Sequence, residues 1–371
     1  MSGDWAGSVV RLGDIVTPSG SVGFINPFIT VDGGDRVSII YQERSDLTRT
    51  WYQRWCANAS GSDPLNAANW SAPAALGVPA GGPGSVATVS SDTILLAQYR
   101  DGDSDGDSDI TIEKGVWNGS GYTWTSLGVV LAGVPVGYDY GCLRAPNITV
   151  AGGVLHMSLY SAERGGQRGI QYAQSSDPLN PVAGTWSARE LLINPNPPAQ
   201  VETNGGVGVT ADGTPVALVW GAGNRDGGAP YANFQRVRGS GGWGAWQPAF
   251  VGDMRYMPTA YGAGSDWVAA DFASDGTPQD GLFALYDRDY ISYWDPETQT
   301  WADVFTNFGT SSGARSASLG VDFNGVNLLS RVYAFNRGNN TLYVGYYMLI
   351  PEPGTLALLG GLAAVGLRRR R

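Results

Sequence analysis

The stretch DWAGSVVRL (residues 4–12) is a tryptophan-containing strand pattern with no strand pattern before it, and its tryptophan recurs along the chain at intervals of 54 to 65 residues. The six tryptophans that follow this pattern are Trp5, Trp70, Trp124, Trp186, Trp246 and Trp301. A fixed recurrence in this range is typical of repeat architectures, in which each repeat is one supersecondary unit. The sequence therefore predicts six related units within its 371 residues.

Each tryptophan strand after the first closes a unit in which three other strand patterns precede it. In the second unit, strands are expected at 86–89, 93–99 and 109–117, followed by the strand of Trp124. The sixth unit ends with a strand pattern at 341–350 and has no tryptophan strand after it. Because the missing strand is at the other end of the chain, we expect residues 4–12 to pair with 341–350 and close a ring.

The fold class predicted from this pattern is all-β, with residues 1–350 forming a six-bladed β-propeller closed by its N-terminal strand. Composition agrees, since 54 Gly and 21 Pro indicate frequent turns and aromatic residues make up 11% of the chain. Aromatic and β-branched residues between turns favour strands. Two β-sandwiches are the alternative, but they would leave the first tryptophan strand without a partner.

The charge of the chain excludes one class of ligand. The net charge is −10, and residues 1–350 carry −13 because the last 21 residues hold four Arg and one Glu. Nucleic-acid binding needs Lys and Arg to neutralise phosphates, so an acidic body argues against it. An acidic body fits an exported soluble domain or one that binds cations. The two cysteines, Cys56 and Cys142, leave open a disulfide or two separate buried thiols.

The last 21 residues are of a different kind. IPEP (350–353) precedes the apolar run GTLALLGGLAAVGL (354–367), which predicts a single hydrophobic helix, and four arginines follow. Proline cannot continue a helix, so the Pro-Glu-Pro run separates the tail from the body. The arginines are expected to stay on the cytoplasmic side of a membrane. These features resemble the PEP-CTERM sorting tail of exported bacterial proteins. The residues that match it are Pro351, Glu352, Pro353, Arg368, Arg369, Arg370 and Arg371.

This resemblance implies export, transient anchoring in the inner membrane through residues 351–371, and processing by an exosortase-type enzyme. The mature protein is then expected at the cell surface or outside the cell. Export also requires an N-terminal signal, and residues 1–5 do not provide one. We therefore expect that the given N-terminus is truncated or that its start codon is misplaced.

The strongest local motif is DGDSDGDSDI (101–110). Carboxylates at alternate positions can converge on a hard cation, and a glycine permits the sharp turn that this requires. The predicted ligands are the side chains of Asp101, Asp103, Asp105 and Asp109 and the carbonyl of Asp107. The spacing resembles the calcium loops of integrin-type (FG-GAP) propellers, and Ca²⁺ is therefore the expected cofactor. The alternative is a solvated acidic hairpin without a cation.

A second resemblance is to sialidase-like propellers. LRAPNITVAGGVLHMSLYSAER (143–164) resembles that family's Arg-Ile-Pro segment and the strand after it, with Ala145 in place of Ile. SSDPLNPVAGTW (175–186) resembles a stretched Asp-box, which is a folding turn. The resemblance implies that Arg144 matches one carboxylate-binding arginine, but the other catalytic residues of the family have no match here.

Few other residues suggest chemistry. Glu43 and Glu163 end equivalent strands and could serve glycoside hydrolysis if their carboxylates were about 5–9.5 Å apart. They could equally cap hairpins. His156 is the sole histidine and is expected to be a hydrogen-bonded core or cleft residue rather than a base. Arginines near the ends of the second strands are expected to be structural, with a ring that binds an anionic ligand as the alternative: Arg44, Arg100, Arg164, Arg225 and Arg337.

The sequence thus favours an exported propeller that acts at the cell surface or in the extracellular matrix as a binding or structural module. Glycan or exopolysaccharide is the expected ligand class. The alternative is a carbohydrate-active hydrolase that uses the central cleft of the propeller. Fold alone does not decide between them.

Overall fold

The structure is a computed structural model, and it describes residues 5–10, 24–32, 34, 36–45, 48–56, 67–105, 108–133, 143–161, 169–192, 205–210, 213–221, 232–249, 267–269, 282–286, 290–295, 298–305, 314–321, 328–335 and 341–349. Within these residues the chain is built from strands and two short 3₁₀ helices, η1 (Ala67–Asn69) and η2 (Ala183–Thr185). The all-β prediction is confirmed for this part of the chain.

The described strands form six antiparallel sheets, which we number as blades 1 to 6. Blade 1 contains β2 (Phe24–Val31), β3 (Val37–Ser45), β4 (Thr48–Cys56) and β5 (Ala74–Ala75). Blade 2 contains β6 (Gly82–Thr88), β7 (Thr93–Arg100), β8 (Asp109–Trp117) and β9 (Tyr122–Leu131). Blade 3 contains β10 (Leu143–Ala151), β11 (Val154–Ser161), β12 (Gly169–Ser175) and β13 (Glu190–Leu192).

Blade 4 contains β14 (Gly205–Val209), β15 (Pro215–Gly221), β16 (Ala232–Gly239), β17 (Gly242–Trp243) and β18 (Gln247–Pro248). Blade 5 contains β19 (Trp267–Ala269), β20 (Leu282–Tyr286), β21 (Tyr290–Asp295) and β22 (Thr300–Phe305). Blade 6 contains β23 (Ala314–Val321), β24 (Leu328–Phe335), β25 (Thr341–Leu349) and β1 (Trp5–Val10). The strands of each blade follow chain order from one side of the sheet to the other, with two exceptions: β1 is added beside β25, and β18 pairs with β16.

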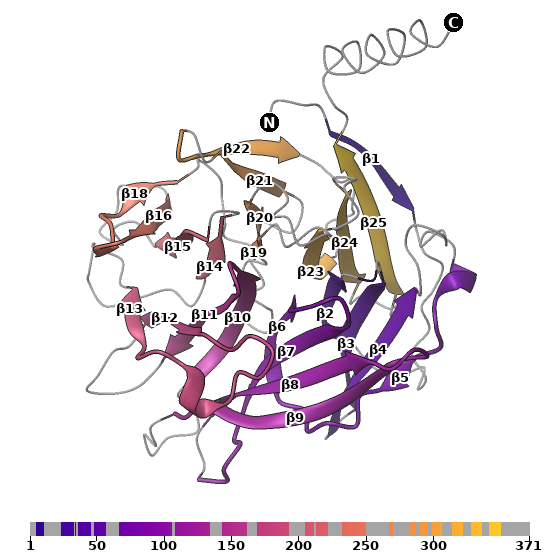
Figure 1. The fold of residues 1–371 in the computed structure, drawn as a ribbon. Coiled ribbons are helices and arrows are strands. Elements are labelled where there is room, and N and C mark those ends of the chain that lie inside the picture. Colours follow the sequence, from indigo (N-terminus) through magenta and orange to yellow (C-terminus); the bar gives the residue numbers. More distant parts are fainter. Residues whose placement is uncertain are drawn as a thin grey trace, which may run out of the picture.

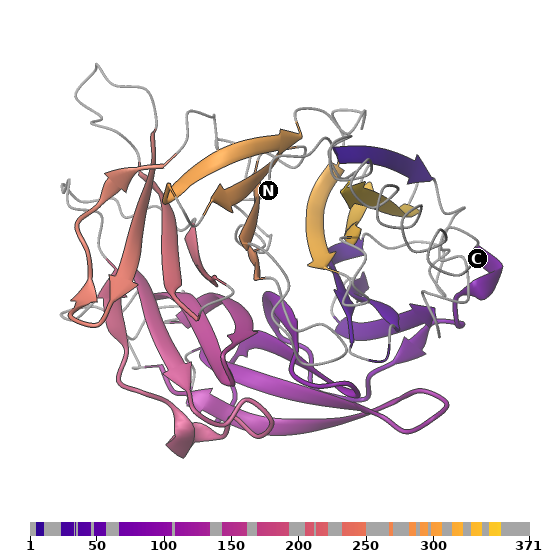
Figure 2. The same cartoon turned by 45° about the horizontal axis from the view of Figure 1, so that its top comes forward.

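The blades are arranged around a common centre, with the first strand of each blade innermost (Figures 1 and 2). β2 contacts β6 and β23, β10 contacts β6 and β14, and β19 contacts β14 and β23. Such a succession of sheets around a centre is the arrangement of a propeller, in which the outer strand of each sheet forms its exposed edge. The described part of the chain is therefore propeller-like.

The N-terminal strand pairs with the last strand of the described chain. β1 runs antiparallel to β25, with Trp5 opposite Leu349 and Val10 opposite Val344. This is the pairing that the unpartnered tryptophan pattern at residues 4–12 predicts. It joins the two most distant described segments of the sequence in one sheet.

The prediction that every tryptophan pattern is itself the outer strand is wrong for three of the six positions. Trp70 and Trp186 make isolated bridges directly after η1 and η2, and Trp246 precedes β18. In blade 1, Ser71 Oγ accepts a hydrogen bond from the Trp55 amide at 3.0 Å, and the ladder resumes at β5. In blades 1 and 3 a 3₁₀ helix therefore forms directly before the tryptophan, where the pattern predicts an outer strand.

The second strand of blade 2 is buried on both faces, as its apolar sequence predicts. Ile94 and Leu96 pack with Phe28 and Trp51 of blade 1. The alternate residues of β7 pack toward blade 3, where Leu95 and Ala97 join Ile148, Val150 and Leu155. Because side chains alternate between the faces of a strand, a continuous apolar run suits a strand held between two neighbouring blades.

Residues 350–371 lie outside the described part of the chain, so the predicted tail helix and the boundary at residue 350 stay predictions. Among the residues that the structure describes, no helix has the length and apolar character needed to cross a membrane.

Candidate functional site

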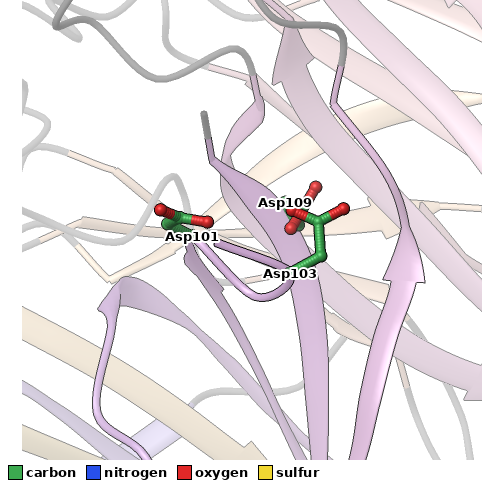
Figure 3. Close-up of side chains that lie close together, drawn as sticks. All are labelled: Asp101, Asp103 and Asp109. Carbon is green, nitrogen blue, oxygen red and sulfur yellow. The ribbon is translucent and has the colours of Figure 1, made fainter. Parts of the chain in front are cut away.

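The hairpin between β7 and β8 brings three of the five predicted metal ligands together. Asp101 and Asp103 lie in the hairpin and Asp109 begins β8, and one carboxylate oxygen from each lies within 4.8 Å of the others (Figure 3). Asp105 lies exposed in the same hairpin but is not part of this group. Asp107 lies outside the described residues. The alternate spacing therefore gives a cluster of three carboxylates.

Local hydrogen bonds shape the hairpin around these carboxylates. Asp101 Oδ1 accepts a hydrogen bond from the Ser104 amide at 2.7 Å, and Ser104 has a φ of 70°. A positive φ is uncommon for a residue with a side chain. At Gly102 an added Cβ would lie 2.5 Å from Val129 Cγ2, so only glycine fits there. The turn is thus defined by one aspartate and one glycine of the motif.

Asp109 is the buried member of the cluster, and backbone hydrogen bonds hold its carboxylate in place. Its side chain is fully buried and accepts hydrogen bonds from the amides of Gly102 at 3.0 Å and Gly133 at 2.9 Å. The neighbouring Ser108 hydroxyl donates to the Leu143 carbonyl at 3.0 Å, which ties the hairpin to the first strand of blade 3. Asp109 is therefore held rigidly by the fold, whereas Asp101 and Asp103 are exposed to solvent.

The carboxylates of the cluster repel one another. The pKa of Asp103 is raised, first by partial loss of solvent around the carboxyl and then by repulsion from Asp109 and Asp105. A divalent cation would remove this repulsion. Three carboxylate oxygens are the hard ligands that Ca²⁺ prefers, with backbone carbonyls and waters completing its six to eight ligands. The described donors therefore fit calcium.

Most of the other residues singled out in the sequence lie outside the described residues or have no described side chain. Glu43 pairs with Phe24 and Thr50 in the blade 1 ladder, but only its backbone position is described. Arg144 lies in β10 opposite Tyr160, also without a described side chain. Glu163, Arg164, Arg225, Arg337 and Cys142 lie outside the described residues, and Cys56 is buried in β4. The separation of Glu43 and Glu163 therefore stays open.

His156 is a buried, hydrogen-bonded residue between blades 3 and 4, as expected. It is 4% exposed, and its Nδ1 lies 2.7 Å from the Tyr172 hydroxyl. Burial lowers the pKa of His156 to about 4, and the charge of Arg238 acts in the same direction. Arg238 itself pairs with Glu190 at 2.8 Å. The imidazole is neutral at physiological pH and has the role of a core residue.

A buried polar network between blades 1 and 2 was not expected from the sequence. Gln98 donates to Glu113 at 2.9 Å and accepts from Trp51 Nε1 at 2.8 Å, and both Gln98 and Glu113 are fully buried. Burial raises the pKa of Glu113, opposed by its hydrogen bonds and by the charge of Arg100. The sequence DITIE (109–113) does contain the relevant pattern, since its polar residues alternate with Ile110 and Ile112. Alternation shows which face they share, but not that the face is buried.

Comparisons with known proteins identify the tail and the fold. The model of the PEP-CTERM protein-sorting motif matches residues 349–371. A comparison with curated protein sequences found no match to the chain.

Several solved structures share the fold of the body at low sequence identity. An α-L-arabinanase of Penicillium chrysogenum complexed with arabinobiose is 12% identical, with a TM-score of 0.57 over 92% of this chain and 98% of the other. A GH93 α-L-arabinofuranosidase of Fusarium graminearum with arabinobiose is 14% identical, with a TM-score of 0.57 over 91% and 97%. A protein of unknown function from Dyadobacter fermentans is 12% identical, with a TM-score of 0.57 over 93% and 98%.

At such identities the likeness shows the fold alone. The sorting motif implies export, exosortase processing and sorting to the cell surface. This chain therefore combines an all-β, propeller-like body with a C-terminal PEP-CTERM sorting motif.

Proposed function

We propose that this chain is an exported, six-bladed β-propeller that binds a glycan or exopolysaccharide at the cell surface or in the extracellular matrix. The observation that carries the proposal is the sorting motif at residues 349–371, which implies export and sorting to the cell surface. In this proposal residues 354–367 form a membrane helix until an exosortase-type enzyme removes it. The pairing of β1 with β25 supports a closed ring.

The propeller-like fold supports a carbohydrate as the ligand class. The arabinanase and arabinofuranosidase with the same fold were both solved with arabinobiose bound. Hydrolysis is the second candidate function for the same reason. We favour binding because, apart from Arg144, the catalytic residues of sialidase-like propellers have no match in the sequence.

A binding screen with product analysis separates the two functions. The full chain would be titrated with arabino-oligosaccharides and with exopolysaccharide fragments, and the supernatant analysed for released sugars by anion-exchange chromatography. The proposal expects saturable binding to at least one glycan without new reducing ends. Release of shorter sugars would establish the hydrolase instead, and no binding to any glycan would refute the carbohydrate assignment.

We further propose that the aspartate cluster of Asp101, Asp103 and Asp109 holds one Ca²⁺, with Asp105 and Asp107 as the remaining predicted ligands. A ligand that binds the folded state alone stabilises it by about 2.7 kcal/mol at a concentration 100-fold above its dissociation constant. Calcium is therefore expected to raise the thermal unfolding midpoint relative to EGTA. The double substitution Asp101→Asn/Asp103→Asn should abolish this response.

The control for the calcium experiment is Asp92→Asn, which removes an exposed carboxylate at the opposite end of the same sheet. Asp109 is left intact because the amides of Gly102 and Gly133 depend on it. The control should keep the full response to calcium. An unchanged midpoint in the unmodified chain, together with no bound calcium by native mass spectrometry, would rule the site out.

A further inference from the structure

The outer strand of blade 2 is unusually long and uncharged. β9 covers ten residues, whereas the other outer strands of the described chain cover two to six. Its sequence, YTWTSLGVVL, contains no Asp, Glu, Lys or Arg. Natural proteins usually protect such edges with charged side chains, with proline or by keeping the strand short. β9 uses none of these three devices.

One side of β9 has no backbone partner within the described part of the chain. The strand pairs with β8 along its inner side. No other described strand pairs with it, and no backbone hydrogen bond from a described turn or loop reaches it. Alternate N–H and C=O groups of an outer strand point away from its ladder. Within the described residues these groups have no partner strand.

The regular part of this edge is Tyr122–Ser126. These five residues pair in unbroken register with residues 113–117 of β8. Beyond Ser126 the register shifts and Gly128 has a φ of 79°. A bulge turns an edge away from new partners. Thr123, Thr125 and Ser126 are exposed, so the first half of β9 is the available surface.

Symmetry favours a second copy of this chain as the partner, and the absence of charged residues in β9 permits the approach. Two copies of a protein with a net charge of −10 repel each other over most of their surface. An uncharged strand is where they can approach with little such repulsion. An antiparallel pair of identical strands also has a two-fold axis, which closes the assembly at two subunits. With the axis at Trp124, Thr123 of each copy lies opposite Thr125 of the other, and Thr–Thr pairs are favourable cross-strand neighbours.

We propose that two copies of this protein associate through Tyr122–Ser126 of β9, which joins their second blades into one continuous sheet. This interface would lie on the outer rim of blade 2, since β9 is the strand farthest from the centre in chain order. It leaves the centre of the propeller unobstructed. Dimer formation through β9 is therefore independent of glycan binding, and an experiment can refute one proposal without affecting the other.

The test compares oligomeric state with local amide protection. The full chain in mild detergent, which covers the apolar tail, would be studied by sedimentation velocity over a range of concentrations. The substitution Thr123→Lys/Thr125→Lys places like charges across the proposed pair and should raise the dimer dissociation constant about tenfold or more. Ser240→Lys/Thr298→Lys adds the same charge at exposed turn positions and should leave the dimer unchanged.

Hydrogen exchange on the unmodified chain locates the interface without any substitution. Amides of residues 122–126 should become more protected as the dimer forms, while those of β22 stay unchanged. The proposal is overturned if the unmodified chain stays monomeric at all concentrations, or if the β9 double variant dimerises as tightly as the control. It is also overturned if protection increases at another segment, such as the tail, and not at residues 122–126.

Discussion

Replacing His156 with glutamine is expected to remove a large pH-dependent loss of stability from this protein. Burial lowers the pKa of His156 to about 4 in the folded chain, whereas an unfolded histidine titrates near 6.5. Between these values the unfolded state binds more protons, so the free energy of unfolding falls as the pH falls. The shift corresponds to about 3 kcal/mol, lost progressively from pH 6.5 to pH 4.

The measurement is the free energy of unfolding from urea titrations at several pH values for the unmodified chain and His156→Gln. Glutamine keeps a polar group for the Tyr172 hydroxyl, which lies 2.7 Å from His156 Nδ1. His156 is the sole histidine, so the difference between the two proteins isolates one group. Tyr172→Phe serves as the control, because it removes the hydrogen bond but keeps the buried imidazole and its pH dependence. If the free energy of unfolding depends on pH in the same way for the unmodified chain and His156→Gln, then the pKa of His156 is not lowered by folding.

Deleting residues 1–12 is expected to convert the body into an aggregating protein. The deletion removes β1, which leaves β25 as an outer strand of nine residues. The sequence of β25, TLYVGYYML, has no charged residue. A long uncharged edge of this kind is a template for pairing with other chains. The expected result is a shift from the molar mass of the full chain to large aggregates in size-exclusion chromatography with light scattering.

The matched control deletes residues 1–4 and keeps β1 from Trp5 onward. This shorter deletion should behave as the full chain does. A synthetic peptide of residues 4–12, added during refolding of the longer deletion, should restore the original molar mass by completing the sheet. If the chain without residues 1–12 shows the molar mass and thermal midpoint of the full chain, then β1 contributes little to blade 6.

The sequence predicts the repeat and the pairing of its first strand with its last strand, because both predictions follow from patterns of neighbouring residues. A tryptophan every 54 to 65 residues marks the units, and the pattern at residues 4–12 has no strand before it. The structure pairs this segment with β25. The apolar run of β7 likewise predicts a strand buried on two faces, and its side chains pack toward blades 1 and 3. Periodicity and apolar content depend only on neighbouring residues.

The outer strands are predicted less well because the local pattern competes with turn formation. The residues around Trp70 and Trp186 resemble those of the other tryptophan strands, yet each tryptophan directly follows a short 3₁₀ helix. In blade 3 the Ser187 amide donates to the Gln174 carbonyl at 2.8 Å, as the Ser71 amide does to the Trp55 carbonyl in blade 1. The serine after each tryptophan therefore re-establishes the ladder. Nothing in the spacing of the tryptophans distinguishes these two blades from blade 2.

The local sequence pattern also predicts only part of the candidate site. The alternating aspartates predict a cluster, and Asp101, Asp103 and Asp109 form it. Spacing does not show which of the aspartates lie together without a cation, or that Asp109 is buried and accepts a hydrogen bond from the amide of Gly133, 24 residues later in the chain. Burial and distant hydrogen bonds depend on how blades pack. They appear in the structure and not in the pattern of the motif.

The central claim is that this propeller-like body is exported and released by processing of its tail, and the intact mass of the mature protein tests it most directly. The chain would be expressed behind a genuine signal peptide in a host that carries an exosortase system. The account predicts a released protein that lacks Arg371 and the apolar run 354–367, and a full-length, membrane-bound product when Pro351, Glu352 and Pro353 are all changed to alanine. A matched double change in the body, Asn118→Ala/Ser120→Ala, should leave processing intact. A mature protein that keeps Arg371 in that host would contradict the account.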